Sequence, residues 1–335
     1  MSDRLGPLLA CPLCGGALFE RDERLACADG HSYGIVDGIP RLFREEEGSD
    51  ASSIRESFSS EWSAFRHGED RPWGPDFHER GQKALQELDC NPEWLRGRLV
   101  LDAGCGAGKL SSILASWGAN VVATDISYSV DAARDATSGP AMRHIDFVQA
   151  DLNHPPFRPG SFDVIFSGGV LHHNPDTRQS LEVLLDLLAP GGTIYVWLYR
   201  PLPGVAHKVR AVVRRAVVRL PARVQRAIFR PWAAQSLLRQ RLRAATGRES
   251  SDVRHNFRER LVTLLDHYTP RYRWEHTPDE VRHWYEELGL TDIRQTDDST
   301  YGFGMLARLP AAAEMRRPAG AEPVHYSLPG VRRAS

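Results

Sequence analysis

The sequence has no long apolar run and few cysteines. No stretch of its 335 residues is apolar over the roughly 20 residues that a membrane-spanning helix needs. The first residues, MSDRLGPLLACPLC, lack the basic and apolar regions of a secretion signal. Five cysteines without an export signal argue against a disulfide scaffold. These absences favour a soluble cytoplasmic protein, in which cysteines at ligand-like spacing are better interpreted as metal ligands.

One long segment of the chain is strongly basic and contains no acidic residue. The chain has 42 Lys and Arg against 43 Asp and Glu, yet the segment 200–248 holds twelve Arg, one Lys and no acid. Hydrophobic residues make up 41% and charged residues 25%, which is ordinary for a globular protein. The length allows one large domain and a small accessory one.

Strand-like and helix-like segments alternate from residue 98 to residue 200. Strands are expected in RLVLDAG, NVVATD, HIDFVQAD, FDVIFSG and TIYVWLY, and helices in KLSSILASWG, SVDAARDA and TRQSLEVLLDLLAPGG. Such alternation predicts an α/β fold, with a parallel sheet covered on both faces. After a break at Pro201 the pattern resumes, with helices near 253–266 and 278–288 and strands at 291–296 and 302–309.

The remaining segments divide the chain further. Two helices are expected near 54–67 and 76–89, and a helical insertion near 205–246 is punctuated by Pro221 and Pro231. We therefore expect six parts. They are a metal-binding module at 1–45, a linker with capping helices at 46–97, a core at 98–200, a basic helical lid at 201–266, the end of the core at 267–310 and a disordered tail at 311–335.

A glycine-rich turn follows the first strand of the core, in VLDAGCGAGKL. Gly104, Gly106 and Gly108 would let the backbone approach a ligand, because a Cβ would take up its space and some of these positions can require a positive φ. The dinucleotide fingerprint G-x-G-x-x-G is not present, since Lys109 stands at its third glycine.

Three acidic residues stand at the ends of successive strands. Asp102, Asp125 and Asp151 each close a strand of the core. The carboxyl ends of parallel strands form the crevice in which open α/β sheets bind ligands. One such acid alone is as well explained as a helix N-cap, but three beside a glycine turn predict a ligand site.

Residues from about 97 to 200 resemble the core of class I S-adenosylmethionine (SAM)-dependent methyltransferases. The resemblance rests on VLDAGCGAGKL, VVATDIS, FVQADLNHPPF, FDVIFSGGVLHH and LLAPGGTIYVWLY, which occur in the family's order. It implies a Rossmann-like fold with a seven-stranded, mostly parallel sheet that ends in an antiparallel hairpin. It also implies SAM as cofactor, held at the methionine end by Asp102, Gly104, Cys105 and Gly106, at the ribose by Asp125 and Ile126, at the adenine by Asp151 and Leu152, and bordered at the sulfonium by Ser167 and Gly168.

Two histidines follow the fourth strand of the core, where the methyl group would emerge. His172 or His173 could remove a proton from a hydroxyl acceptor, because imidazole titrates near neutral pH. The alternative is that one or both are structural, and the sequence does not choose between them. Secondary candidates for the acceptor pocket are Tyr199, His207, Tyr268, Tyr272 and His276.

The N-terminal segment carries a metal-ligand pattern. Cys11, Cys14, Cys27 and His31 form two closely spaced pairs, which suit tetrahedral zinc with all four positions filled, so the site would be structural. The spacing resembles the zinc domain of large-subunit rRNA guanine methyltransferases. The stretch DGIPRLF resembles the small zinc-ribbon activators of tRNA and protein methyltransferases.

The basic insertion and the acceptor remain open at this stage. Its arginines could be the solvated face of a lid, could hold a phosphate or carboxylate of the acceptor, or could face an anionic membrane or RNA. The main hypothesis is methyl transfer to an O or N atom of a small or medium-sized acceptor, such as a specialised metabolite, a sugar or a lipid-linked precursor. The alternatives are an RNA methyltransferase, against which SGGV replaces an N-P-P-[YF] motif, and a SAM-binding regulatory protein without catalysis. The oligomeric state is not indicated.

Overall fold

We describe a computed structural model of the chain. It describes residues 2–43, 50–62, 76–137, 139–201, 204, 212–245 and 257–311. Outside these ranges lie residues 312–335 of the tail predicted at 311–335, residues 46–49 and 63–75 of the linker and helices predicted at 46–97, and His207. None of the helices in these ranges is long and apolar enough to cross a membrane.

The centre of the molecule is the sheet that the alternating pattern predicts. Its parallel part consists of β7 (Ile145–Ala150), β6 (Asn120–Asp125), β5 (Leu99–Ala103), β8 (Phe162–Gly168) and β9 (Leu188–Tyr199), in that order. The antiparallel pair β11 (Gly302–Arg308) and β10 (Thr291–Asp298) continues the sheet beyond β9. This seven-stranded arrangement confirms the predicted class I methyltransferase fold.

The N-terminal segment extends the same sheet on its other side. β1 (Phe19–Arg21), β2 (Arg24–Ala26), β3 (Ser32–Val36) and β4 (Ile39–Leu42) form an antiparallel series, and β4 then pairs in parallel with β7. In this pairing Arg41 is opposite Gln149, and Leu42 is opposite Ala150. The sheet therefore has eleven strands, and the predicted metal-binding module is continuous with the core.

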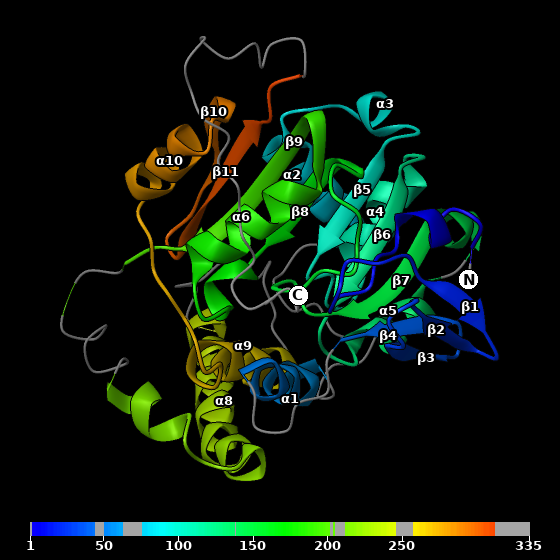
Figure 1. Cartoon of the computed structure of the whole chain (residues 1–335). Helices are drawn as coiled ribbons and strands as arrows, with labels where there is room; N and C mark the ends of the chain where they lie inside the picture. The colour runs from blue at the N-terminus through cyan, green and yellow to red at the C-terminus, as the bar shows by residue number, and fades with distance from the viewer. Residues whose placement is uncertain are drawn as a thin grey trace.

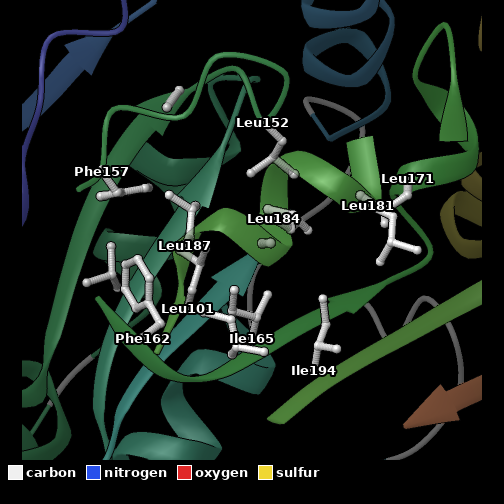
Figure 2. Packing of buried hydrophobic residues seen from close by; sticks show 14 of the residues in the cluster. Leu101, Leu152, Phe157, Phe162, Ile165, Leu171, Leu181, Leu184, Leu187 and Ile194 are labelled. Carbon is white, nitrogen blue, oxygen red and sulfur yellow. The ribbon is translucent and has the colours of Figure 1, made fainter. Parts of the chain in front are cut away.

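Helices cover both faces of the sheet (Figure 1). On one face lie α2 (Phe77–Leu88), α3 (Pro92–Leu95), α4 (Lys109–Ser116) and α5 (Ser129–Ala136), whose apolar residues share a buried cluster with the strands. On the other face lie α6 (Thr177–Leu187) and α10 (Pro278–Glu287). Figure 2 shows Leu181, Leu184 and Leu187 of α6 beside Leu101, Ile165 and Ile194 of the strands.

Two element boundaries differ from the sequence-based expectation. The helix expected from Thr177 up to a Pro-Gly stop at 190–191 ends slightly earlier, at Leu187, and β9 begins at Leu188, which pairs with Phe162. Pro190 has no amide hydrogen to donate to a helix, and Gly191 has a φ of +83°, so this segment does not continue α6. The other helix begins earlier than the expected residue 54, since α1 (Asp50–Trp62) already includes Asp50; residues 63–67 of the expected helix lie outside the described residues.

The helical insertion has a small core of its own. α8 (Ala222–Ala245) packs against α9 (Phe257–Tyr268), and Phe229 and Ala233 of α8 are buried with Leu261 and Leu265 of α9. α8 continues through Pro231, which we expected to interrupt it. Phe229 and Ala233 lie on either side of this proline and face the same partner, so packing against α9 offsets the lost backbone hydrogen bond.

Candidate active site

The glycine turn after β5 is shaped by backbone conformation and by close packing. Gly104, Gly106 and Gly108 have φ values of +89°, +49° and +72°, which favour glycine. A Cβ on Gly104 would lie 2.3 Å from a methyl carbon of Val170, and one on Gly108 would lie 2.8 Å from Ala133 Cβ. At these two positions the protein itself, rather than a ligand's space, requires glycine. This corrects part of the sequence-based explanation.

The three predicted acids lie at one edge of the sheet. Asp102 and Asp125 occupy the carboxyl ends of β5 and β6, and Asp151 directly follows β7. These strands are parallel neighbours in the order β7-β6-β5, so the three carboxylates stand side by side along the edge. All three are at least nine-tenths buried.

Asp102 is the most deeply buried of these acids. One carboxylate oxygen accepts a hydrogen bond of 2.5 Å from Ser111 Oγ at the start of α4. Burial raises the pKa of Asp102 to about 6, although the Ser111 hydrogen bond and the charge of Arg80 oppose this shift. Close to neutral pH the group is therefore ionised but sensitive to a nearby positive charge.

Asp125 connects the glycine turn to the loop after β6. Its Oδ2 accepts a hydrogen bond of 3.0 Å from the Gly106 amide, and its Oδ1 accepts bonds from the amide and the hydroxyl of Ser127. Burial raises the pKa of Asp125, against these hydrogen bonds. Ile126, also predicted at the ribose, accepts a hydrogen bond from the Gln149 side chain through its carbonyl oxygen.

Asp151 organises the loop after β7. Its Oδ1 accepts hydrogen bonds from the amide and the side chain of Asn153, at 2.9 and 3.1 Å. Leu152 is buried in the cluster beneath. Nearer β5, Cys105 is also buried, and this burial raises the pKa of its thiol well above the ordinary value.

Ser167 and Gly168 end β8 on the same edge. Ser167 is fully buried and donates a hydrogen bond of 3.2 Å to the Ala103 carbonyl, which joins β8 to the end of β5. Gly168 is exposed. Both residues are the last of β8, which coincides with the strand expected in FDVIFSG.

The two histidines form a short helical turn after β8 and are buried. His172 is fully buried, and neither ring nitrogen has a hydrogen-bond partner among the described residues. Its ring packs against Tyr199 and His173, with 4.3 Å between ring centroids in each case. Burial lowers the pKa of His172 well below its ordinary value. The imidazole is therefore neutral at pH 7.

His173 is held by groups from the C-terminal part of the chain. Its Nδ1–H donates a hydrogen bond of 2.9 Å to the Tyr272 carbonyl, so in the neutral ring Nε2 is the unprotonated nitrogen. Nε2 lies 3.7 Å from Asp266 Oδ1. Burial lowers the pKa of His173 to about 4, and the charge of Asp266 offsets part of this effect.

Asp266 is a site residue that sequence reasoning missed. It is buried on α9, and its Oδ2 accepts a hydrogen bond of 2.5 Å from the Tyr199 hydroxyl. A signal was available in the sequence, because Asp266 follows Val262 and Leu265 on the apolar side of a helical pattern. Tyr199, one of the secondary candidates, thus joins β9 to the insertion.

A strap at 271–276 closes the region over the histidines. The Trp274 amide donates to the His172 carbonyl, and the Arg273 guanidinium lies 3.9 Å above the Tyr199 ring. The other secondary candidates have structural contacts. Tyr272 stacks on Trp274, Tyr268 packs on Phe229, and the His276 ring pairs with Thr177 and Glu280.

Helix α1 contacts both halves of this edge. Phe58 packs edge-on against His173, with 5.2 Å between ring centroids, and Ser59 Oγ accepts a hydrogen bond from the Tyr128 amide after β6. An ion pair of 2.9 Å joins Asp50 to Arg271 of the strap. Helix α1 therefore covers both the edge of the sheet that carries the acids and the turn that carries the histidines.

The four predicted metal ligands lie together at the N-terminal end of the sheet. Their ligand atoms are all within 4.8 Å of one another. The Cys14 and Cys27 sulfurs are 3.7 Å apart, and His31 Nδ1 lies 3.5 and 3.3 Å from the Cys11 and Cys27 sulfurs. A tetrahedron around zinc with Zn–S of about 2.3 Å has edges of about 3.8 Å. The donor set and its spacing therefore fit one tetrahedral ion.

The comparisons with known proteins agree with this architecture. Residues 101–196 match the family described as "Methyltransferase domain". An uncharacterized protein of Synechococcus is 31% identical over 210 residues, which are 59% of this chain and 48% of that protein. A ubiquinone biosynthesis O-methyltransferase of Xanthomonas campestris is 35% identical over 103 residues, or 30% of this chain and 43% of that enzyme. An uncharacterized methyltransferase of Mycobacterium tuberculosis is 37% identical over 127 residues, or 38% of this chain and 60% of that protein.

The match and the fold together define the class of the catalytic part. The chain contains a methyltransferase domain with the class I, Rossmann-like fold, in which the glycine turn and the acids stand at the carboxyl edge of the sheet. The chain spans about half the length of the curated relatives it matches.

Proposed function

We propose that the protein transfers a methyl group from SAM to an O or N atom of a small or medium-sized acceptor. The observation that carries this proposal is the row of Asp102, Asp125 and Asp151 at the carboxyl ends of three adjacent strands, with the buried histidines in the turn that follows the neighbouring strand β8. Bound SAM supplies an electrophilic methyl group on a sulfonium. The residues of this chain bind it, exclude water and receive the acceptor's proton.

Each of the three acids would bind a different part of the cofactor. Asp102 suits the methionine ammonium, because its carboxylate is buried at the end of β5. Asp125 suits the two ribose hydroxyls, and Asp151 with Leu152 suits the adenine. Asp125 also holds the glycine turn through Gly106, so the ribose site and the methionine site would form together.

The cofactor affinity should depend on pH through Asp102. Its pKa in the free protein is raised to about 6, so protonation below this pH removes the charge that would face the ammonium group. Calorimetry with S-adenosylhomocysteine (SAH) should show affinity that is flat above pH 7 and about tenfold weaker at pH 5. The Asp102→Asn variant should bind weakly and lose much of this dependence. Equal affinity of the wild-type protein at pH 7.5 and pH 5 would contradict the assignment.

Of the two histidines, His172 is the better candidate for the base. His173 is fixed through Nδ1 to Tyr272 and faces Asp266 through Nε2, whereas His172 has no hydrogen-bond partner for either nitrogen among the residues described. An acceptor hydroxyl or amine would supply the missing partner and deliver its proton to this ring. His173 would then position its neighbour by packing.

Replacing His172 should slow methyl transfer without changing the affinity for the cofactor. We expect His172→Gln to slow methyl transfer by about 10²–10⁴-fold while SAH affinity stays unchanged. The assay follows label from methyl-tritiated SAM into a protein-free cell extract that serves as the acceptor pool. His283→Gln, on the exposed side of α10, is the matched control. Wild-type turnover in His172→Gln would remove this residue from the mechanism.

The second part of the proposal is a structural zinc ion at Cys11, Cys14, Cys27 and His31. The fit of the four ligand atoms to one tetrahedron supports it. With every position taken by protein, the ion would have no open site for substrate. It would instead hold the two turns that carry the cysteines, formed where Gly15 N bonds Cys11 O and Gly30 N bonds Cys27 O.

RNA as the acceptor remains a second candidate, supported by the arginines of the insertion. An RNA platform would make affinity fall steeply with salt, with a slope of roughly −0.7 to −0.9 per phosphate contacted. We expect only weak binding of tRNA and rRNA fragments in a gel-shift titration, and none at physiological salt. Tight binding at that salt with methyl transfer to RNA would replace the small-acceptor proposal, but not the methyltransferase assignment.

A further inference from the structure

Helix α8 exposes a row of large apolar side chains. Val224, Ile228, Trp232, Leu238 and Leu242 are 37%, 41%, 45%, 59% and 58% exposed. At about 100° per residue they fall within an arc of about 120° and extend along about 27 Å of helix. We call these five residues the apolar stripe.

The apolar stripe is not the face that holds the insertion together. Phe229 and Ala233 lie on the other side of α8, buried with Leu261 and Leu265 in the small core that α8 shares with α9. In Figure 1, α8 lies at the edge of the molecule, and α9 lies nearer to the sheet. A helix that packs on one neighbour needs only one apolar face. The second apolar face of α8 is therefore expected to contact something other than the described residues of this chain.

The charges around the stripe restrict that occupant. The sequence of α8 contains six arginines and no acidic residue. Arg223, Arg230 and Arg241 are exposed along one flank of the stripe, and Arg239 is exposed within the arc of the stripe itself. The occupant must therefore accept apolar side chains along a line and present negative charge beside that line and between the apolar contacts.

We propose that the apolar stripe and its flanking arginines bind the surface of an anionic lipid bilayer. An amphipathic helix that carries Trp and Leu on one face and Arg beside it lies in the plane of the membrane interface. The stripe is a ridge along the outer side of α8, which suits a flat surface. The leucines and Trp232 enter the acyl boundary, while the arginine stems lie along it and the guanidinium groups reach the lipid phosphates. RNA would satisfy the arginines but would leave the five apolar side chains in water. This proposal goes beyond methyl transfer and does not depend on it.

Co-sedimentation of the full chain with vesicles tests the proposal. One set of vesicles contains phosphatidylcholine only, and the other contains equal parts of phosphatidylcholine and phosphatidylglycerol. We expect binding to the anionic vesicles, weakened by salt, and little binding to the neutral ones. Leu238→Gln with Leu242→Gln should reduce the affinity for the anionic vesicles by on the order of tenfold or more. Burial of one leucine side chain in the acyl region contributes about tenfold or slightly less to this affinity. Phe19→Gln, which removes a 61% exposed aromatic side chain from β1, should bind as the wild type does.

The stripe residues point away from the small core, so the double variant should keep the wild-type circular dichroism and melting temperature. If the double variant melts earlier, the blue shift of tryptophan emission on vesicle binding gives the second measurement. It should be present in the wild type and reduced in Trp232→Gln. Three results would overturn the proposal. They are no binding to anionic vesicles at low salt, unchanged binding by the double variant, or a lipid-free dimer that the double variant abolishes.

Discussion

Replacing Asp125 with alanine should weaken SAH binding by on the order of 2–4 kcal/mol, or about 30- to 900-fold in Kd. The variant loses the charge-assisted hydrogen bonds to the ribose hydroxyls. It also loses the contacts with the Gly106 amide and with Ser127, which shape the glycine turn. Isothermal titration calorimetry at pH 7.5 measures the change.

The control for this variant is Asp135→Ala, which removes the same charge from an exposed position on α5. Its SAH affinity should equal that of the wild type. Asp125→Asn keeps the shape of the side chain, and its SAH affinity should lie between that of Asp125→Ala and that of the wild type. If Asp125→Ala binds SAH as tightly as the wild type, the ribose is not held at the end of β6.

The second large effect concerns the metal. Cys14→Ser should abolish the one zinc ion per chain that we expect in the purified wild-type protein, and should unfold the segment around the ligands first. Structural zinc binding is coupled to folding and contributes on the order of 10 kcal/mol in small zinc modules. Metal analysis and limited proteolysis measure the two effects. Cys90→Ser, outside the cluster, is the matched control.

Metal loss should also weaken the cofactor site. The Ala10 amide, next to Cys11, donates to the Pro156 carbonyl, and the Arg158 amide donates to the Leu8 carbonyl, so the first turn is fastened to the loop that follows Asp151. On the other side, β4 pairs with β7 directly before Asp151. We expect SAH affinity to fall about tenfold in Cys14→Ser. A tenfold change corresponds to about the net free energy of one hydrogen bond, here lost on the adenine side of the cofactor. A freshly purified wild-type protein without zinc would refute the metal site, and intact SAH binding in Cys14→Ser would refute the coupling.

Much of the core could be predicted because its signals are local. Each strand of the core is a short apolar run, and the acid that closes it is read directly from the sequence, as with Asp102 and Asp125. The edge that these acids share follows from a general rule for parallel sheets. The strands β10 and β11 were predicted from the same kind of local pattern, whereas their antiparallel pairing was predicted from the resemblance to the family.

The pairing of β4 with β7 could not be predicted in this way. Arg41 and Gln149 are 108 positions apart, and no local pattern states that an N-terminal strand will extend the central sheet. The same pairing brings Arg41 to Asp131 of α5 and so joins three elements. The glycine turn shows a related limit, because Val170 and Ala133, which exclude a Cβ at Gly104 and Gly108, come from distant segments.

The contacts that surround the histidines could not be predicted from the sequence either. His172 and His173 were found as candidates from their position after β8. Their roles differ only through Asp266, Tyr199 and Tyr272, which come from β9 and the C-terminal part of the chain. The choice of His172 as the base therefore depends on tertiary contacts.

The central claim is that SAM binds along the carboxyl edge of β5, β6 and β7. Hydrogen–deuterium exchange of the full chain with and without SAH tests it directly. We predict slower exchange at 103–108, 125–128 and 150–153, which are the three segments that carry the acids, and unchanged exchange in β10 and β11. Tight SAH binding that protects other segments and leaves these three unchanged would contradict the account.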